Sequence, residues 1–248
     1  KYARLVAERY GTNHREHEVL PDVGGLIEKI VRSFDEPFSD DSTIPSYFVS
    51  QLARRNVTVA LSGLGGDEMF CGYERYLGFQ MSRAYDKIPG IIRENTVRRF
   101  VEKLPEFSTG NYAVNHLKRF VRSSSSDYGR RYFGFMTKMN GKYRDVFFSE
   151  RGSRYAEALD AVEKRFVGLF DSAPADEPLN RVFYCDTKTY LPEDILACTD
   201  RLSMHHSLEV RVPLVDSKLL KIIAPLLVTP ERPLGKAWLA RALRQELP

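Results

Sequence analysis

The chain has 248 residues, of which 43% are hydrophobic and 28% charged, so it is long enough to bury a sizeable core in one domain or two lobes. Its net charge of +4 is mild and its basic residues are scattered, which argues against a nucleic-acid partner, because such a protein needs a dense basic stripe or a recognisable module. There is no apolar run of membrane-spanning length, no signal peptide, and no paired or metal-ligand spacing among the three cysteines. The composition therefore favours a cytoplasmic protein with reduced thiols and no membrane partner.

The first part of the chain predicts helices that alternate with strands. Residues 1–12 look like a helix, and residues 16–20 are a plausible first strand. Apolar residues at helical spacing predict further helices around residues 26–34 and 44–52. The β-branched apolar run at residues 57–61 predicts a buried strand, so a strand, two helices and a strand would form a parallel, right-handed crossover.

Almost everything after that strand is helical by pattern. Clear apolar stripes run through residues 155–169 and 219–226, whereas four serines at residues 123–126 predict a loop and residues 172–178 separate two helices. The sequence therefore predicts an α/β fold that is mostly helical around a small parallel sheet.

The most informative segment is a glycine-rich turn between the strand at residues 57–61 and a helix. Gly63, Gly65 and Gly66 let the backbone turn sharply and approach a ligand without Cβ obstruction. From Asp67 onward, apolar residues recur at helical spacing as far as residue 77, so the free N–H groups of the first helical turn would point back at the loop. This layout predicts an anion site that fits a phosphate.

Two carboxylates complicate this anion site. Asp67 and Glu68 would face the anion, which makes sense if a divalent cation lies between them, because Mg²⁺ prefers oxygen ligands. Without a metal, the same two side chains would only favour the N-terminus of the helix.

The segment from Ser62 to Tyr73 closely resembles the synthetase-domain motif of glutamine-dependent asparagine synthetases. Its sequence, Ser-Gly-Leu-Gly-Gly-Asp-Glu-Met-Phe-Cys-Gly-Tyr, is followed and preceded by other segments in the family's order. These are Asp-Glu-Pro-Phe-Ser-Asp at 35–40, Ile-Pro-Ser-Tyr at 44–47, Leu-Pro-Glu-Asp-Ile-Leu at 191–196, Asp-Arg-Leu-Ser-Met at 200–204, Glu-Val-Arg-Val-Pro at 209–213 and Gly-Lys-Ala-Trp-Leu at 235–239. The resemblance covers nearly the whole chain and is weakest over residues 89–186. It implies one synthetase domain over residues 1–248, with the adenine-nucleotide alpha-hydrolase-like (ATP-pyrophosphatase) fold.

One motif of the family is absent from the sequence. The family's Ser-Gly-Gly-x-Asp-Ser loop, which grips the pyrophosphate of ATP, does not occur here, and neither does an N-terminal catalytic cysteine. By resemblance, we expect the chain to be a fragment truncated at both ends. The glutaminase domain and the first strand–loop–helix unit of the synthetase domain would then lie upstream of residue 1.

The resemblance implies two-step amide formation with ATP and Mg²⁺ as cofactors. A small-molecule carboxylate, aspartate or an analogue, would attack the α-phosphorus of ATP, and ammonia would then displace AMP from the acyl-adenylate. The ammonia would come from glutamine through the missing N-terminal glutaminase domain. Both steps develop negative charge, which needs cations and N–H dipoles placed in advance.

Five residues of the turn are the expected nucleotide and metal site. By resemblance, Ser62, Gly63, Leu64 and Gly65 would bind the nucleotide, and Asp67 would share Mg²⁺ with the aspartate of the missing loop. The alternative for Asp67 is a helix-capping role.

Two basic residues are expected to stabilise the phosphates. By resemblance, Lys236 would neutralise the departing pyrophosphate and Arg201 would lie next to the nucleotide. A surface lysine on a helix is the alternative for Lys236, and a structural ion pair with Asp200 or Glu209 is the alternative for Arg201.

Glu209 is the candidate for proton transfer or for orienting the substrate amine, as a carboxylate in the corresponding segment of lactam-forming relatives does. Glu209 and Arg211 flank one valine, so extended geometry would put both charges on the same side, and we expect one of them to be buried and paired. A salt bridge that only locks the segment is the alternative.

Leu64 is the sharpest departure from the family. Asparagine-forming enzymes carry Glu at this position and lactam-forming relatives carry Tyr, whereas leucine can neither move a proton nor hold an amine. This predicts a carboxylate substrate other than aspartate. Two alternatives stay open: a lactam- or macrolactam-forming synthetase of the same fold, and a non-catalytic paralogue that acts as a binding protein. Whether the protein forms a homodimer also stays open.

Overall fold

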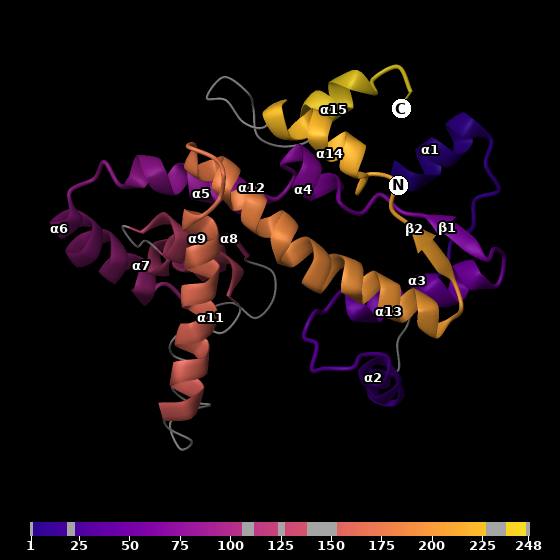
Figure 1. The fold of residues 1–248 in the computed structure, drawn as a ribbon, viewed down its shortest axis with the longest axis horizontal. Helices are drawn as coiled ribbons and strands as arrows, with labels where there is room; N and C mark the ends of the chain where they lie inside the picture. Colours follow the sequence, from indigo (N-terminus) through magenta and orange to yellow (C-terminus); the bar gives the residue numbers. More distant parts are fainter. Residues whose placement is uncertain are drawn as a thin grey trace. The chain divides into compact units, whose positions relative to one another are not determined.

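The computed structural model describes residues 2–18, 23–105, 112–123, 127–137, 153–226 and 237–246. The chain divides into two compact units, the first formed by Lys1–Gly72 with Asp186–Pro248 and the second by Tyr73–Cys185. Both are mostly helical, as the sequence predicts (Figure 1). The assignment of residues 1–248 to one synthetase domain stays a prediction.

The first unit contains both strands and the helices around them. Its helical segments are α1 (Tyr2–Tyr10), α2 (Val23–Arg32), α3 (Thr43–Arg54), α4 (Gly66–Phe70), the π-helix η2 (Leu191–Leu196), α13 (Ala197–His205), α14 (Ser217–Ile223), the 3-10 turn η3 (Ala224–Leu226) and α15 (Ala237–Ala242). The expected helices near the beginning of the chain are confirmed by α1, α2 and α3, and the stripe at 219–226 by α14. None of the described helices is long and apolar enough to cross a membrane.

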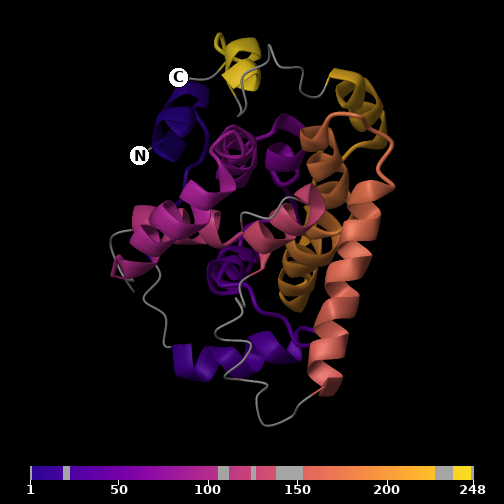
Figure 2. The same ribbon diagram turned by 90° about the vertical axis from the view of Figure 1, so that its left-hand side faces the viewer.

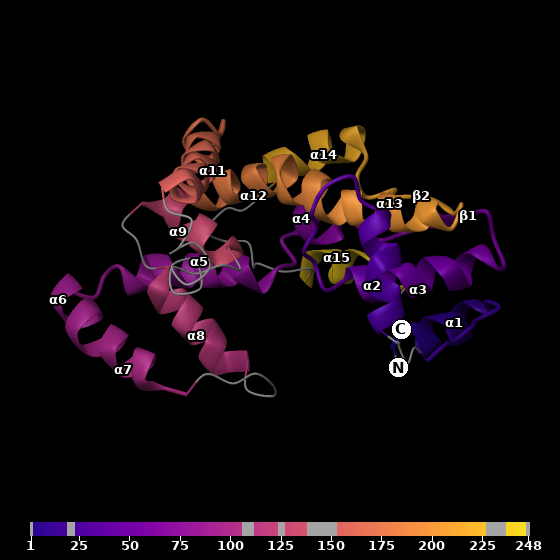
Figure 3. The ribbon, with the colours of Figure 1, turned by 90° about the horizontal axis from the view of Figure 1, so that it is seen from below.

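The sheet pairs two strands that are far apart in the sequence. β1 (Val59–Leu61) runs parallel to β2 (Glu209–Arg211), with Val59 opposite Glu209 and Leu61 opposite Arg211. Figure 3 shows the two strands side by side at one end of α13. Because the strands are parallel, their carboxyl ends meet at one edge, and the segments that follow them start close together.

Two expectations about strands are wrong. The described part of the expected strand at residues 16–20, residues 16–18, is not a strand, so β1 has β2 as its partner instead, and residues 19–20 lie outside the described part. The expected strand at 57–61 is confirmed in type but is not buried, because Val59 is 39% exposed and Leu61 74%. Parallel sheets are normally covered on both faces, whereas here the face that carries Val59 and Leu61 is exposed.

Two apolar clusters hold the first unit together. The first lies where α2, α3 and α13 meet and contains Leu26, Ile30, Tyr47, Cys198 and Leu202. The second, called the α4 cluster below, joins α4, η2 and α14 and is formed by the buried residues Met69, Phe70, Leu191 and Ile223. Partly buried Leu214, Val215, Leu220 and Leu239 pack against the α4 cluster. This cluster therefore connects α4 with the segment that follows β2.

The described residues of the second unit form helices joined by short loops and no strand. Its elements are α5 (Glu74–Tyr85), α6 (Gly90–Ile92), the π-helix η1 (Arg93–Arg98), α7 (Arg99–Lys103), α8 (Tyr112–Arg122), α9 (Tyr128–Met136), α11 (Ser153–Asp171) and α12 (Pro178–Lys188), whose last residues belong to the first unit. The long helix α11 (coral in Figure 2) packs against α9 and confirms the predicted stripe at 155–169. The break predicted at 172–178 separates α11 from α12.

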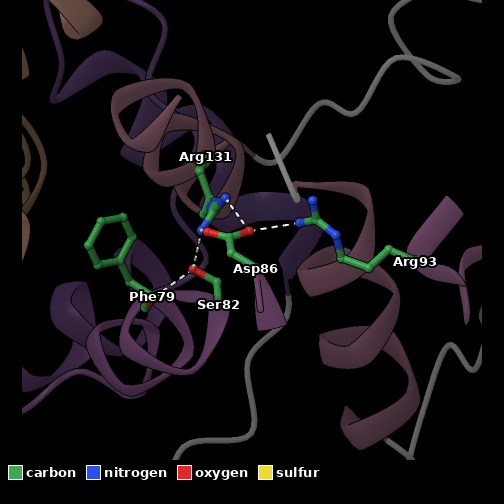
Figure 4. A network of polar contacts seen from close by, with 5 residues as sticks. All are labelled: Phe79, Ser82, Asp86, Arg93 and Arg131. Atoms are coloured by element: carbon green, nitrogen blue, oxygen red, sulfur yellow. Dashed lines mark hydrogen bonds and ion pairs between the residues drawn. The ribbon is translucent and has the colours of Figure 1, made fainter. Parts of the chain in front are cut away.

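A buried ion pair joins three elements of the second unit (Figure 4). Arg131 of α9 is fully buried and donates two hydrogen bonds to the carboxylate of Asp86, at 2.7 and 2.9 Å. Arg131 also donates to Ser82 Oγ at 3.0 Å, and Arg93 of η1 donates to Asp86 at 2.7 Å. Charge-assisted hydrogen bonds from two guanidinium groups to one carboxylate fix α5, η1 and α9 to one another.

Candidate functional site

The glycine loop, residues Ser62–Gly65, lies at the carboxyl edge of the sheet. It leaves β1 directly, and its first backbone N–H, that of Ser62, donates to the carbonyl oxygen of Arg211 at 2.9 Å. The segment after β2 turns at the same edge, where the N–H of Val215 donates to the carbonyl oxygen of Val212 at 2.9 Å. In sheets of parallel strands, ligands bind outside the carboxyl ends of the strands, so this edge is where a site is expected.

The backbone of the loop turns into α4 through a left-handed residue. Gly65 has φ +84° and precedes the first residue of α4, a conformation that L side chains rarely adopt. The N–H of Gly66 donates to Gly63 O at 3.3 Å, and the N–H of Leu64 donates to Ser62 Oγ at 3.4 Å. The predicted strand–turn–helix layout is thus confirmed.

The two ends of the loop differ in how closely other residues approach them. A Cβ built on Gly65 would lie 2.4 Å from Val215 Cγ2, and one built on Gly66 would lie 3.2 Å from Leu214 Cδ1. A Cβ on Gly63 would meet no atom within 4 Å in the described part of the chain. Gly65 is therefore required by packing, whereas the backbone at Gly63 is open to a ligand.

The helix after the loop is much shorter than its apolar pattern predicts. α4 ends at Phe70 because Cys71 adopts the left-handed conformation, with φ 60°, and Gly72 N–H then donates to Asp67 O at 2.8 Å. The expectation of one helix as far as residue 77 is wrong, since α5 begins separately at Glu74. Five residues have a small dipole, so the loop's own N–H groups are the better donors for an anion.

The two carboxylates of α4 have different environments. Asp67 is half-buried in the first turn, two residues after the glycine loop, whereas Glu68 is 2% exposed and belongs to the interior. Of these two carboxylates, only Asp67 is therefore accessible from outside the protein. Burial also raises the pKa of the neighbouring Cys71 thiol to about 12, which makes this cysteine an unsuitable nucleophile.

The residues present fit a Mg²⁺ ion that is shared with a phosphate. Among the described residues, no group of three or more His, Cys, Asp or Glu side chains is arranged to hold a metal. Mg²⁺ usually keeps several waters and is bound by one or two carboxylates together with substrate phosphates, so a single half-buried Asp67 suits that mode. A metal cage made of protein side chains alone does not fit the described part of this loop.

Glu209 and Arg211 form an ion pair with each other on the exposed face of the sheet. Arg211 Nε donates to Glu209 Oε1 at 2.8 Å, as the salt-bridge alternative predicts. The expectation that one of the two is buried is wrong, because both side chains are more than half exposed. In the parallel register, Arg211 lies opposite Leu61, at the edge where the loop begins, and Glu209 lies at the other end of β2.

Arg201 lies on α13 and pairs with a residue that the sequence did not indicate. Its guanidinium contacts the carboxylate of Asp35 at 2.5 Å, so the expected partners Asp200 and Glu209 are both wrong. Asp35 belongs to the segment between α2 and α3, which α13 contacts through the first apolar cluster. The structure therefore supports the structural alternative for Arg201 as an ion pair, while a nucleotide contact stays a prediction.

Lys236 lies outside the described residues. α15 begins at the next position, and its Leu239 packs against the α4 cluster together with Leu214 and Val215. The structure thus relates the helix after Lys236 to the elements that carry the loop.

Sequence reasoning underestimated three residues of this edge. Arg211 accepts the first hydrogen bond of the loop through its backbone, and Leu214 and Val215 lie against the glycines. The only sequence signal for them is their position directly after a short strand, in the segment that ends at the helix cap Asp216.

The comparisons with known proteins agree on one family. A family described as Asparagine synthase matches residues 1–248. The chain is 30% identical over 223 residues to a putative asparagine synthetase (glutamine-hydrolyzing) of Mycobacterium tuberculosis, which covers 89% of this chain and 32% of that relative. It is 29% identical over 190 residues to asparagine synthetase (glutamine-hydrolyzing) 1 of Bacillus subtilis, covering 77% of this chain and 28% of the relative. It is 38% identical over 108 residues to putative asparagine synthetase (glutamine-hydrolyzing) 2 of Methanocaldococcus jannaschii, covering 43% and 18%.

The chain therefore spans about a third of the length of the first of these relatives. No solved structure matches the chain significantly.

Proposed function

The chain belongs to the asparagine synthase family, and from that membership we propose that it is the synthetase part of an ATP-dependent amide-forming ligase. The observation that carries the proposal is the glycine loop at the carboxyl edge of a parallel strand pair, with an open backbone at Gly63. We further propose that the fold is of the ATP-pyrophosphatase type and that the site is completed by segments of a longer protein.

The proposed reaction has two steps. An oxygen of the substrate carboxylate forms a bond to the α-phosphorus of ATP, and the bond from that phosphorus to the pyrophosphate oxygen breaks. Ammonia then forms a C–N bond at the activated carbonyl, the C–O bond to AMP breaks, and the nitrogen loses a proton. Negative charge grows on phosphate oxygens in the first step and on the carbonyl oxygen in the second.

The glycine loop would bind the nucleotide phosphates through backbone N–H groups. Ser62, Gly63, Leu64 and Gly65 form a turn in which a Cβ built on Gly63 would have no described residue within 4 Å apart from its chain neighbours. Absence of a Cβ permits a phosphate to come within hydrogen-bond distance of the main chain. The loop would thus orient the phosphates relative to the substrate carboxylate.

Asp67 would supply one oxygen ligand to Mg²⁺ bound with the nucleotide. Its half-buried position in the first turn of α4, next to the loop, supports this role. When bound, the metal would neutralise charge on the phosphates, and the remaining ligands would come from phosphate oxygens, water and other protein segments. Glu68, being buried, is left with a structural role.

Basic groups would stabilise the leaving pyrophosphate. Lys236 is the proposed residue for this step, and the packing of Leu239 against the α4 cluster supports it by relating the neighbouring helix to the loop. Arg211 is exposed at the start of the loop and is a second candidate, although its pair with Glu209 must open for a full contact. Arg201 would reach a nucleotide only if its ion pair with Asp35 also opens.

Glu209 is proposed as a proton acceptor for the attacking amine, a role in which its ion pair with Arg211 must open. Leu64 is half-buried in the loop and offers no acid or base. We therefore propose that the acyl substrate is a carboxylate other than aspartate. A non-catalytic binding role is the competing outcome of the experiment below, and lactam closure, in which no ammonia is used, is the competing reaction at the same site.

The experiment measures isotope exchange between pyrophosphate and ATP in the full-length protein, with Mg²⁺ and a panel of carboxylates that includes aspartate. Asp67→Asn should lower the exchange rate at least tenfold, and glutamine hydrolysis should stay unchanged because it occurs elsewhere. Asp171→Asn, which changes an exposed aspartate at the end of α11, is the matched control. Absence of exchange with every carboxylate would overturn the ligase proposal in favour of a binding role, and ordinary asparagine formation from aspartate would overturn the interpretation of Leu64.

A further inference from the structure

The segment after β2 lies directly against the glycine loop. We propose that Val215, assisted by Leu214, is a positioning residue that holds the glycine loop in its ligand-binding conformation. The inference rests on the proposed function in so far as that ligand is a nucleotide. Val215 and Leu214 are apolar and have no acid, base or nucleophile, so their role in the site would be to hold the loop in position.

The first argument is the closeness of the contact. Val215 Cγ2 is only 2.4 Å from the position that a Cβ on Gly65 would take. Leu214 Cδ1 is 3.2 Å from the corresponding Cβ position on Gly66. Side chains this close to the main chain leave Gly65 and Gly66 no room to move toward the turn. The left-handed conformation of Gly65, φ +84°, is thus held from one side by Val215.

The second argument is that the turn carrying Val215 is itself well anchored. The N–H of Val215 donates to Val212 O at 2.9 Å, and the carboxylate of Asp216 accepts from the N–H groups of Lys218 and Leu219 at 2.7 and 3.1 Å. The latter contacts cap α14, which is buried in the α4 cluster through Ile223. The turn with Val215 is therefore fixed by the cap of α14 and by the α4 cluster, so the side chain of Val215 can restrict movement of the loop.

The third argument is the difference between the two ends of the loop. Gly65 and Gly66 are packed against the turn, whereas at Gly63 no described residue comes within 4 Å of a Cβ position. The hydrogen bond from Ser62 N–H to Arg211 O fixes the beginning of the loop to β2. The loop is thus held at its beginning and its end, and its free surface lies between these two points.

A role of this kind predicts a specific kinetic signature. If Val215 only raises the fraction of molecules whose loop can bind, its loss lowers the apparent affinity for nucleotide in proportion to the fall in that fraction. Saturating nucleotide then restores the competent form of the loop. In pyrophosphate–ATP exchange by the full-length protein, Val215→Ala should raise the KM for ATP about tenfold and change kcat less than threefold. Val215→Ile, which keeps the branched Cβ and Cγ2, should restore a KM within about threefold of the original.

The matched control is Leu220→Ala. Leu220 packs against the same α4 cluster from α14, whereas the atoms nearest to Gly65 and Gly66 come from Leu214 and Val215. It should lower thermal stability as Val215→Ala does and leave the KM for ATP within twofold. An equal rise of KM in both variants would mean that the cluster acts only through overall stability, and it would overturn the positioning role.

A second readout needs no activity and separates this inference from the proposed function. Hydrogen exchange at the amides of Leu64 and Gly66, both hydrogen-bonded within the loop, should speed up at least fivefold in Val215→Ala and not in Leu220→Ala. Faster loop exchange in a protein without any pyrophosphate exchange would leave the positioning role standing and refute the ligase. Unchanged loop exchange in Val215→Ala would refute the positioning role whatever the activity.

Discussion

Gly65→Ala gives the sharpest test of the loop geometry, because two separate costs meet at this residue. An alanine would have to adopt φ +84°, and left-handed backbone costs an L residue about 1–2 kcal/mol. Its Cβ would also stand 2.4 Å from Val215 Cγ2, and overpacking of that kind costs roughly 1–3 kcal/mol. We expect the free energy of unfolding to fall by about 2–5 kcal/mol in total.

The two costs can be separated with a double mutant. Val215→Ala removes the methyl group that meets the new Cβ, so it should relieve the overpacking and leave the backbone strain. Urea unfolding of Gly65→Ala, Val215→Ala and the double mutant gives the coupling free energy between the two sites. We expect the double mutant to be more stable than the sum of the single changes by about 1–2 kcal/mol, within the range for residues in contact.

Gly63→Ala is the matched control within the same loop. Its φ is not left-handed, and no atom of the described residues lies within 4 Å of the new Cβ, so the free energy of unfolding should change by less than about 0.5 kcal/mol. The same change should weaken nucleotide binding, because the methyl group would stand on the open side of the loop. Additive effects of Gly65→Ala and Val215→Ala, or a Gly63→Ala variant as unstable as Gly65→Ala, would refute the reasoning.

Three further predictions concern buried polar groups. In urea unfolding, Arg131→Met should lower the free energy of unfolding by about 3 kcal/mol, since Asp86 loses its bidentate partner. Arg130→Met removes an exposed ion pair and should lower it by under about 1 kcal/mol. Similar losses in both variants would contradict the buried-pair account. Burial and a neighbouring histidine lower the pKa of His206, so the unfolded chain binds this proton more readily and stability is lost as pH falls below about 6.5. In His206→Phe, the melting temperature should therefore fall less between pH 7 and 5 than in the original protein. An unchanged dependence of melting temperature on pH would rule this group out. Cys71, with a pKa raised to about 12, should resist Ellman's reagent at pH 8 until the protein unfolds, and rapid labelling of the native protein at this residue would contradict its burial.

Local patterns predicted the glycine loop and several helices of this protein, although they missed the end of α4. The apolar spacing of residues 155–169 belongs to one helix, and the same holds for the stripes in α2 and α3, because helical periodicity depends only on neighbours within a few residues. The glycine loop was equally predictable, since a strand, three glycines and a helix are consecutive in the chain. The end of α4 was missed because Cys71, an ordinary L residue, takes the left-handed position that glycine usually occupies.

Strand pairing and charge pairing were not predictable in the same way. The partner of β1 lies about 150 residues away, and nothing in the sequence of either three-residue strand distinguishes it from the run at residues 16–20. The ion pair between Arg201 and Asp35 likewise depends on the packing of α13 against the segments around α3, so sequence proximity suggested the wrong partners. Burial of β1 was overestimated because apolar composition indicates what a strand can cover, and it does not indicate which layers are present.

The register of β1 against β2 decides which groups lie at the carboxyl edge of the sheet. Since Leu61 lies opposite Arg211, the backbone of Arg211 accepts the first hydrogen bond of the loop, and the turn with Val215 arrives four residues later against Gly65. A slip of one residue would turn Glu209 and Arg211 to the other face of the sheet and move Val215 away from Gly65. The glycines alone therefore do not define the loop, because the same sequence in another register would lack the side chain that holds it. Substitutions in β2 should accordingly change the loop even where they leave every loop residue intact.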